Sequence, residues 1–182
     1  MARRIRYTGT VEDVLPLAEV EAWLRLRPNS KEIDLLKSVL LPGVIAQCEA
    51  RTSAAIAPAE YQEIWSSAMR SGQPLDIGQA TRLISVVNSN GDVVDSTAWR
   101  VQQDQRETFV HYAPGLAVGG HVITYEAGID LAAYPSVKTW LLMAVATLFA
   151  QRELIVVGTI TAELPKSFVD FLLSDITVPP RF

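Results

Sequence analysis

The sequence contains few of the residues from which proteins usually build catalytic or metal centres. Its 182 residues include one cysteine, Cys48, and two histidines, His111 and His121. A single cysteine excludes a disulfide within the chain, and this cysteine content is typical of a reducing compartment. Neither histidine has cysteine or acidic residues near it at the spacing of zinc ligands. We therefore interpret both histidines as structural, and Cys48, which lies on an apolar helical stripe, as part of the core.

The sequence also lacks the motifs of common enzyme classes. It contains no GxxxxGK[ST], no GxGxxG after a strand and no GxSxG. The glycine-rich stretch 113–120 joins two predicted strands, so it lacks the helix N-terminus that would bind phosphate. We therefore predict that the protein is not an enzyme and has no catalytic, cofactor-binding or metal-binding residues.

Charged residues are scarce as well, at 20% of the chain, and the net charge is −4. Such an acidic chain is not, as a whole, an electrostatic nucleic-acid binder. Arg3, Arg4 and Arg6 form a basic cluster, which we interpret as a solvated terminus, with contact to an acidic neighbour or to phosphate as the alternative. No apolar stretch of a secretory signal follows them. No apolar run reaches the roughly 20 residues that cross a bilayer, so we expect no membrane span.

Apolar residues, by contrast, make up 49% of the chain. They are densest in residues 125–153, which predict the end of a strand, a turn at Gly128 and a helix that begins at Pro135. No charge occurs between Thr139 and Ala150. A helix that is apolar on all sides has to be buried, either in its own core or against a partner.

Two further helices are predicted before residue 53. Residues 17–26 have apolar side chains at three- and four-residue steps, which indicates a short amphipathic helix. A second helix begins near Asn29 and carries an apolar stripe that ends at Cys48. Pro42 and Gly43 interrupt this stripe, so we expect a kink or a break there.

Extended segments follow. They are predicted at residues 61–65, 82–88, 93–95, 98–102, 108–112 and 121–126, and Asn90-Gly91 is a hairpin signal. Residues 154–162 fit a strand or an extended crossing, and residues 164–174 fit a last short helix. The resulting fold class is α+β. We expect mainly an α-helical bundle, with a small antiparallel β-sheet or hairpin as an insertion.

We divide the chain into an N-terminal arm (1–14), a single domain (15–174) and an extended C-terminal tail (175–182). The tail cannot be helical past Pro179 and Pro180. Its side chains are candidates for contact with a partner or another subunit, namely Ile176, Val178, Arg181 and Phe182.

Several short motifs follow one another along residues 15–173. They are L-x-E-x-x-x-W-L-R at 17–25, C-E-x-x-T at 48–52, a hairpin from Ile84 to Gly91, Y-x-A-G at 125–128, Pro135, R-E at 152–153 and a final F-L-L at 171–173. Their order resembles the head–tail connector, or head-completion adaptor, family of long-tailed bacteriophages and prophages. Two features depart from the family. Pro42-Gly43 breaks a helix that is usually smooth, and Thr52-Ser53-Ala54 replaces a common T-G-R.

The resemblance implies a structural protein of the virion neck, present in the host cytoplasm during assembly. About twelve copies would form a ring under the portal protein, extend the DNA channel without gripping DNA, and dock the stopper or tail-completion protein. Two other interpretations stay open. One is another phage structural protein, such as a tail-completion protein. The other is a small ligand-binding or enzymatic α+β domain whose site the sequence does not reveal.

Overall fold

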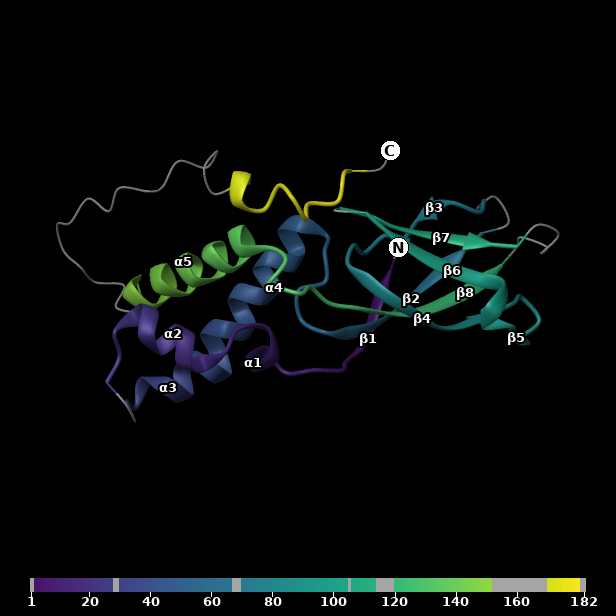
Figure 1. Ribbon diagram of the computed structural model, residues 1–182. Coiled ribbons are helices and arrows are strands. Elements are labelled where there is room, and N and C mark those ends of the chain that lie inside the picture. Colours follow the sequence, from purple (N-terminus) through teal and green to yellow (C-terminus); the bar gives the residue numbers. More distant parts are fainter. Residues whose placement is uncertain are drawn as a thin grey trace.

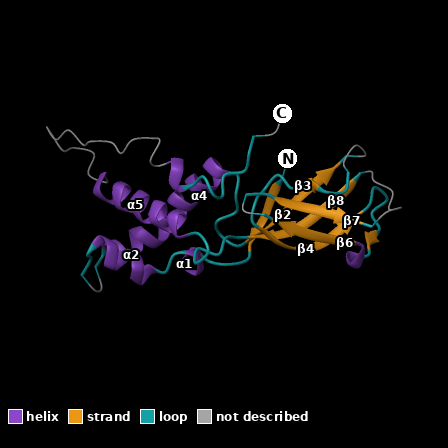
Figure 2. Ribbon diagram, turned by 45° about the horizontal axis from the view of Figure 1, so that its top comes forward, coloured by secondary structure: helices purple, strands orange, loops and turns teal. Residues whose placement is uncertain are grey.

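The computed structural model describes residues 2–27, 30–66, 70–104, 106–113, 120–151 and 170–180. Helices gather at one end of the molecule and strands at the other (Figures 1 and 2). We call these parts the helical lobe and the β lobe. The chain first builds the helices up to residue 52, then most of the strands, and then returns to the helical end. The helical lobe is therefore made from both halves of the sequence.

The helical lobe has one hydrophobic core to which all its longer helices contribute. Val44 and Cys48 meet Trp140 and Leu141 in this core, and the predicted core position of Cys48 is thus confirmed. Burial raises the pKa of the Cys48 thiol to about 12. The elements are α1 (Val11–Val14), α2 (Leu17–Leu24), α3 (Glu32–Leu35), the π-helix η1 (Leu36–Leu40), α4 (Leu41–Thr52) and α5 (Pro135–Gln151).

The interruption expected at Pro42 takes the form of a change in helix type. The π-helix η1 ends at Leu40, and Pro42 then stands in the first turn of α4. The proline therefore lies inside a continuous helical stretch, directly after a wider π-helical turn, which suits a residue that cannot donate a backbone hydrogen bond. Leu36, Leu40 and Leu41 all keep right-handed helical backbone angles, so the chain stays helical from α3 to α4 instead of breaking.

Two antiparallel sheets form the β lobe. Five strands lie in the order β1-β2-β8-β4-β5, and three in the order β3-β7-β6. Trp65, Tyr125 and Val110 meet in a second hydrophobic core, to which both sheets contribute. The strands are β1 (Arg3–Tyr7), β2 (Ala59–Trp65), β3 (Gln73–Pro74), β4 (Ala80–Val87), β5 (Val93–Val94), β6 (Trp99–Gln103), β7 (Thr108–Tyr112) and β8 (His121–Ala127).

The fold class predicted from the sequence is wrong. The sequence predicts a mainly α-helical bundle with a small sheet or hairpin inserted, whereas the described residues contain eight strands in two sheets with a core of their own. The helices are mostly short, from four residues in α1 to 17 in α5, and they make one lobe of the molecule. The extent of the sheets was missed because β1 pairs with β2, and β2 with β8, across long stretches of sequence. Such pairing leaves no mark in local periodicity.

The first residues of the chain take part in both lobes. Residues Arg3–Tyr7 form β1, an edge strand on β2, and Thr10 and Asp13 then form a capping box that begins α1. The predicted strand or crossing at 154–162 and most of the last helix at 164–174 lie outside the described residues. Across the part of the chain that the structure describes, no helix is long and apolar enough to cross a membrane.

Candidate functional site

The two histidines lie on strands of different sheets. His121 on β8 is buried beside Trp99, with 5.6 Å between the ring centroids, while His111 on β7 is partly exposed. Within the described residues, no group of three or more His, Cys, Asp or Glu side chains could hold a metal ion. Residues 114–119 of the glycine-rich stretch lie outside the described part of the chain.

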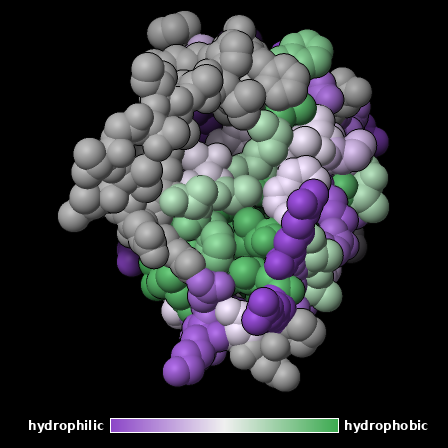
Figure 3. Space-filling model, turned by 90° about the vertical axis from the view of Figure 1, so that its left-hand side faces the viewer, coloured by the Kyte–Doolittle hydropathy of each residue, from purple (hydrophilic) through white to green (hydrophobic). Residues whose placement is uncertain are grey.

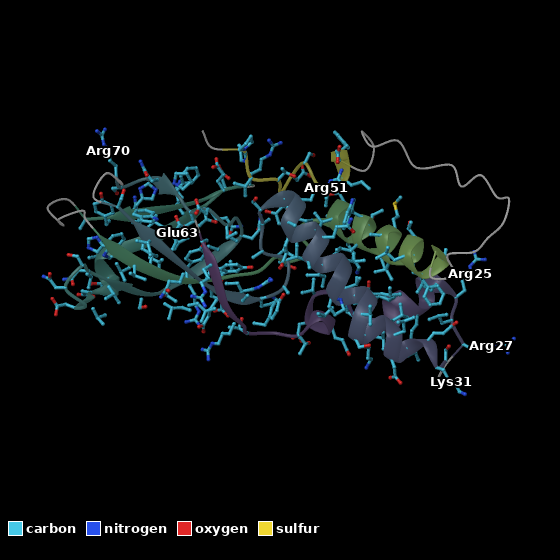
Figure 4. All side chains as sticks on the ribbon, turned by 180° about the vertical axis from the view of Figure 1, so that it is seen from behind. Arg25, Arg27, Lys31, Arg51, Glu63 and Arg70 are labelled. Atoms are coloured by element: carbon cyan, nitrogen blue, oxygen red, sulfur yellow. The ribbon has the colours of Figure 1, made fainter. Side chains whose placement is uncertain are left out.

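One buried carboxylate was not singled out from the sequence. Glu63 on β2 is only 2% exposed and lies inside the β lobe (Figure 4). Its carboxylate accepts hydrogen bonds from Trp65 Nε1 and from the backbone N–H of Asp76, both at 3.0 Å, and from the Tyr125 hydroxyl at 3.5 Å. Burial nevertheless raises the pKa of Glu63 above its usual range, because desolvation outweighs these donors. The alternation Tyr61-Glu63-Trp65 was the signal that could have revealed this inward position.

The predicted basic cluster is mostly used within the chain. Arg4 Nη1 donates to Glu49 Oε2 at 2.6 Å, and Arg6 Nη2 donates to Glu60 Oε1 at 2.6 Å. Glu49 Oε1 also accepts the backbone N–H groups of Ile56 and Ala57, each at 3.1 Å. Glu49 therefore ties the end of α4 to β1 and to the segment that leads into β2.

The predicted tail contacts divide into two pairs. Ile176 is fully buried in the core of the helical lobe, and Val178 is 9% exposed. The backbone N–H of Val178 donates to the Thr52 carbonyl at 2.8 Å, while its Cγ2 would lie 2.9 Å from a Cβ added to Gly78. Ile176 and Val178 thus pack against their own chain where the two lobes meet. Arg181 and Phe182 lie outside the described residues, and their contact with a partner stays a prediction.

Several hollows lie along the helical lobe and the tail, and two of them illustrate their character. The larger, of 610 Å³, is bounded by the tail and by Arg51, Ser53 and Asp76. Arg51 is paired with Asp170 (Figure 4). The smaller, of 230 Å³, lies between α4 and α5, and its lining includes Trp140, Met143 and Leu148. Apolar side chains also gather in the middle of the helical end of the molecule, bordered by hydrophilic ones (Figure 3). The apolar character of these surfaces is more typical of contact with other protein surfaces than of a catalytic site.

A second group of cations was also not foreseen. Arg25, Arg27 and Lys31 project from the far end of the helical lobe (Figure 4). Arg25 ends α2 in the left-handed conformation, with φ 54°. Elsewhere in this lobe Lys37 pairs with Glu12 at 3.0 Å, and Lys138 pairs with Glu19. These three cations thus lie near one another at the far end of the helical lobe, where Glu32 follows Lys31 in the sequence.

Comparison with known proteins identifies a shared fold. Neither a scan against protein-family models nor a search of curated proteins finds a match. Among solved structures, a chain in the virion of a native gene transfer agent (GTA) particle superposes with a TM-score of 0.69 at 20% identity. Chains from the neck of an empty GTA particle computed with C6 symmetry and of a native particle computed with C12 symmetry give TM-scores of 0.68 and 0.62, at 21% and 20% identity. Each alignment covers 100% of this chain and 97% of the other. This protein therefore has the fold of chains found in a GTA particle and its neck.

Proposed function

We propose that this protein is a structural subunit of the neck of a phage-like particle. The observation that carries the proposal is the likeness to GTA neck chains, which covers 100% of this chain and 97% of the other, with TM-scores of up to 0.68. A shared fold by itself does not determine function. The order of the sequence motifs supports the same assignment independently of the superposition.

The more specific proposal is a head–tail adaptor. In this proposal the copies form a ring under the portal protein, extend the DNA channel and dock the stopper or tail-completion protein. The family resemblance suggests about twelve copies in the ring. Ring symmetry in the related particles supports it, because neck chains of this fold occur in structures computed with C6 and C12 symmetry. The net charge of −4 suits a channel through which DNA slides without being held.

The test is the mass of the purified protein, measured by light scattering and followed by particle imaging, alone and with the matching portal ring. A closed ring, free or on the portal, is the expected result. A protein that stays monomeric at all concentrations and does not bind the portal would contradict the proposal. The interpretation as a small ligand-binding domain would then become the better one.

The tail contact is tested separately. Removing only Arg181 and Phe182 spares Ile176 and Val178, which are buried in the chain's own core. We expect portal binding or ring formation to weaken in the shortened protein while its unfolding midpoint stays unchanged. Unchanged assembly would remove these two residues from the list of partner contacts.

A further inference from the structure

An aliphatic row crosses the exposed face of the five-stranded sheet. Ile64 on β2 lies opposite Val122 on β8, Val122 lies opposite Val87 on β4, and Val87 lies opposite Val93 on β5. Residues that lie directly opposite each other in antiparallel strands share a face. Their neighbours in sequence, such as Trp65, Ile123 and Val86, are buried on the other face. The four aliphatic side chains therefore form one line across the outer face.

The two ends of this row are its most exposed points, and both lie at open edges of the sheet. Ile64 is 72% exposed and Val93 is 74% exposed. β5 is the last strand on its side of the sheet. On the other side the pairing of β1 with β2 stops where Arg3 lies opposite Gln62, so residues 63–65 have no β1 partner in the described chain. In the described chain, each of these segments therefore lies at an edge of the sheet and carries an exposed aliphatic side chain, which is where another strand can add.

The two edges also match in length and in charge. β5 has two residues, Val93 and Val94, and the uncovered end of β2 has three, residues 63–65. Asp92 and Asp95 flank β5 directly, while the exposed Arg3 lies at the uncovered end of β2. Two other arginines on the outer face already have acidic partners within the chain, since Arg6 pairs with Glu60 and Arg82 pairs with Glu126. Arg3 is therefore the better candidate to attract Asp92 and Asp95 of another copy.

We propose that these edges meet between copies of this chain, so that β5 of one copy adds to the free end of β2 in the next. Val93 of one copy would then lie beside Ile64 of its neighbour, and the aliphatic row would continue from subunit to subunit. The two edges are different surfaces of one chain. Such a head-to-tail contact closes into a ring when its rotation angle fits. This inference rests on the proposed function and identifies the contact that would join the ring.

The size of the contact determines the conditions of the test. Stable pairs of proteins bury about 800 Å² on each partner, and a short strand pair with a row of aliphatic side chains covers much less. Two copies alone are therefore expected to associate weakly. Closing the ring, or assembling on the portal, adds contacts for every subunit.

The experiment tests the proximity of Ile64 and Val93 by disulfide cross-linking, because a disulfide forms only when the two Cα atoms lie within about 7 Å of each other. The double variant Ile64→Cys/Val93→Cys is concentrated, alone and on the matching portal ring, and then mildly oxidised. The expected result is a ladder of covalent multimers on a denaturing gel, while each single variant gives dimers at most. Cys48 is fully buried and does not contribute cross-links. The matched control is Val39→Cys/Val93→Cys, in which Val39 is 55% exposed but lies on the helical lobe; it should give no ladder.

A second variant tests the same contact by measuring assembly, without oxidation. Val93→Asp adds a charge to the aliphatic row and should lower the assembled fraction at least about tenfold, whereas Val39→Asp should leave it unchanged. If the wild type assembles but the Ile64→Cys/Val93→Cys variant gives no ladder, or if Val93→Asp assembles like the wild type, this inference is wrong and the proposed function still stands. If the wild type never assembles, alone or on the portal, the proposed function fails and this inference fails with it.

Discussion

Glu63 is a carboxylic acid surrounded by the aromatic core of the β lobe, and its environment has a consequence for pH. Burial raises its pKa, so the folded protein holds the Glu63 proton more tightly than the unfolded chain does. The stability linked to this group is therefore largest at acidic pH. It is lost as pH rises from about 4.3, the ordinary pKa of glutamic acid, through the raised pKa of the folded state.

Substituting Glu63→Gln removes this titration. We expect the difference in free energy of unfolding between wild type and variant to change in the variant's favour as pH rises above about 4.3, and to level off once pH exceeds the raised pKa of Glu63. Urea unfolding at several pH values measures this difference. A difference that does not depend on pH would show that Glu63 has an ordinary pKa. The variant also changes the hydrogen bonds that three donors make to the Glu63 carboxylate, and this change adds a contribution to the difference that does not depend on pH.

At the scale of elements, the tail packs as part of the fold up to Val178. Ile176 is fully buried among the helices, whereas Phe171 on the preceding turn is 75% exposed. Ile176→Ala should lower the free energy of unfolding by about 2–5 kcal/mol, because it leaves a cavity in the core. Phe171→Ala should change it by less than about 0.5 kcal/mol. Chemical denaturation of both variants provides the comparison, and equal effects would mean that the tail does not pack as described.

Local patterns predicted the elements whose causes are local. The strands at 61–65, 108–112 and 121–126 correspond to β2, β7 and β8, and α5 begins at Pro135 as its proline indicated. By contrast, three arginines in β1 indicated a solvated terminus, because their partners are far away in sequence. Arg4 reaches Glu49, 45 positions away, and Arg6 reaches Glu60, 54 positions away. A sequence without aligned relatives contains no signal for such pairs.

Prediction of the candidate surfaces from the sequence was limited in the same way, because these surfaces also depend on contacts between distant residues. The apolar character of Ile176 and Val178 indicated that the tail would dock, but only tertiary structure could decide between the chain's own core and a partner. The aliphatic row could not be predicted at all. It depends on the register of four strands, and a shift of one residue in any pairing would turn its side chains to the opposite face.

At the scale of the whole molecule, the described residues form two separate hydrophobic cores, one in each lobe. Glu49 on α4 is a polar link between the lobes, since it accepts hydrogen bonds from Arg4 on β1 and from two backbone N–H groups. Glu49→Ala should lower the free energy of unfolding by about 2–4 kcal/mol, because it leaves these donors without their acceptor.

The matched control is Glu60→Ala, which removes only the ion pair with the exposed Arg6. Its stability should stay close to that of the wild type, because solvent and salt screen such pairs. Thermal and urea unfolding of the two variants give the comparison. If both substitutions had the same effect, Glu49 would not be a link between the lobes.

The order of the two lobes along the chain has a consequence for synthesis. Seven of the eight described strands lie between α4 and α5, and β1 precedes them, so the ribosome completes all eight before α5 emerges. Until then Val44, Ile45 and Cys48 of α4 are not covered by Trp140 and Leu141 of α5, with which they share a core in the finished protein. A nascent chain that has reached β8 therefore carries a folded sheet and an uncovered apolar helix side by side. Such exposed surface favours aggregation, so the protein is most prone to misassembly just before α5 leaves the ribosome.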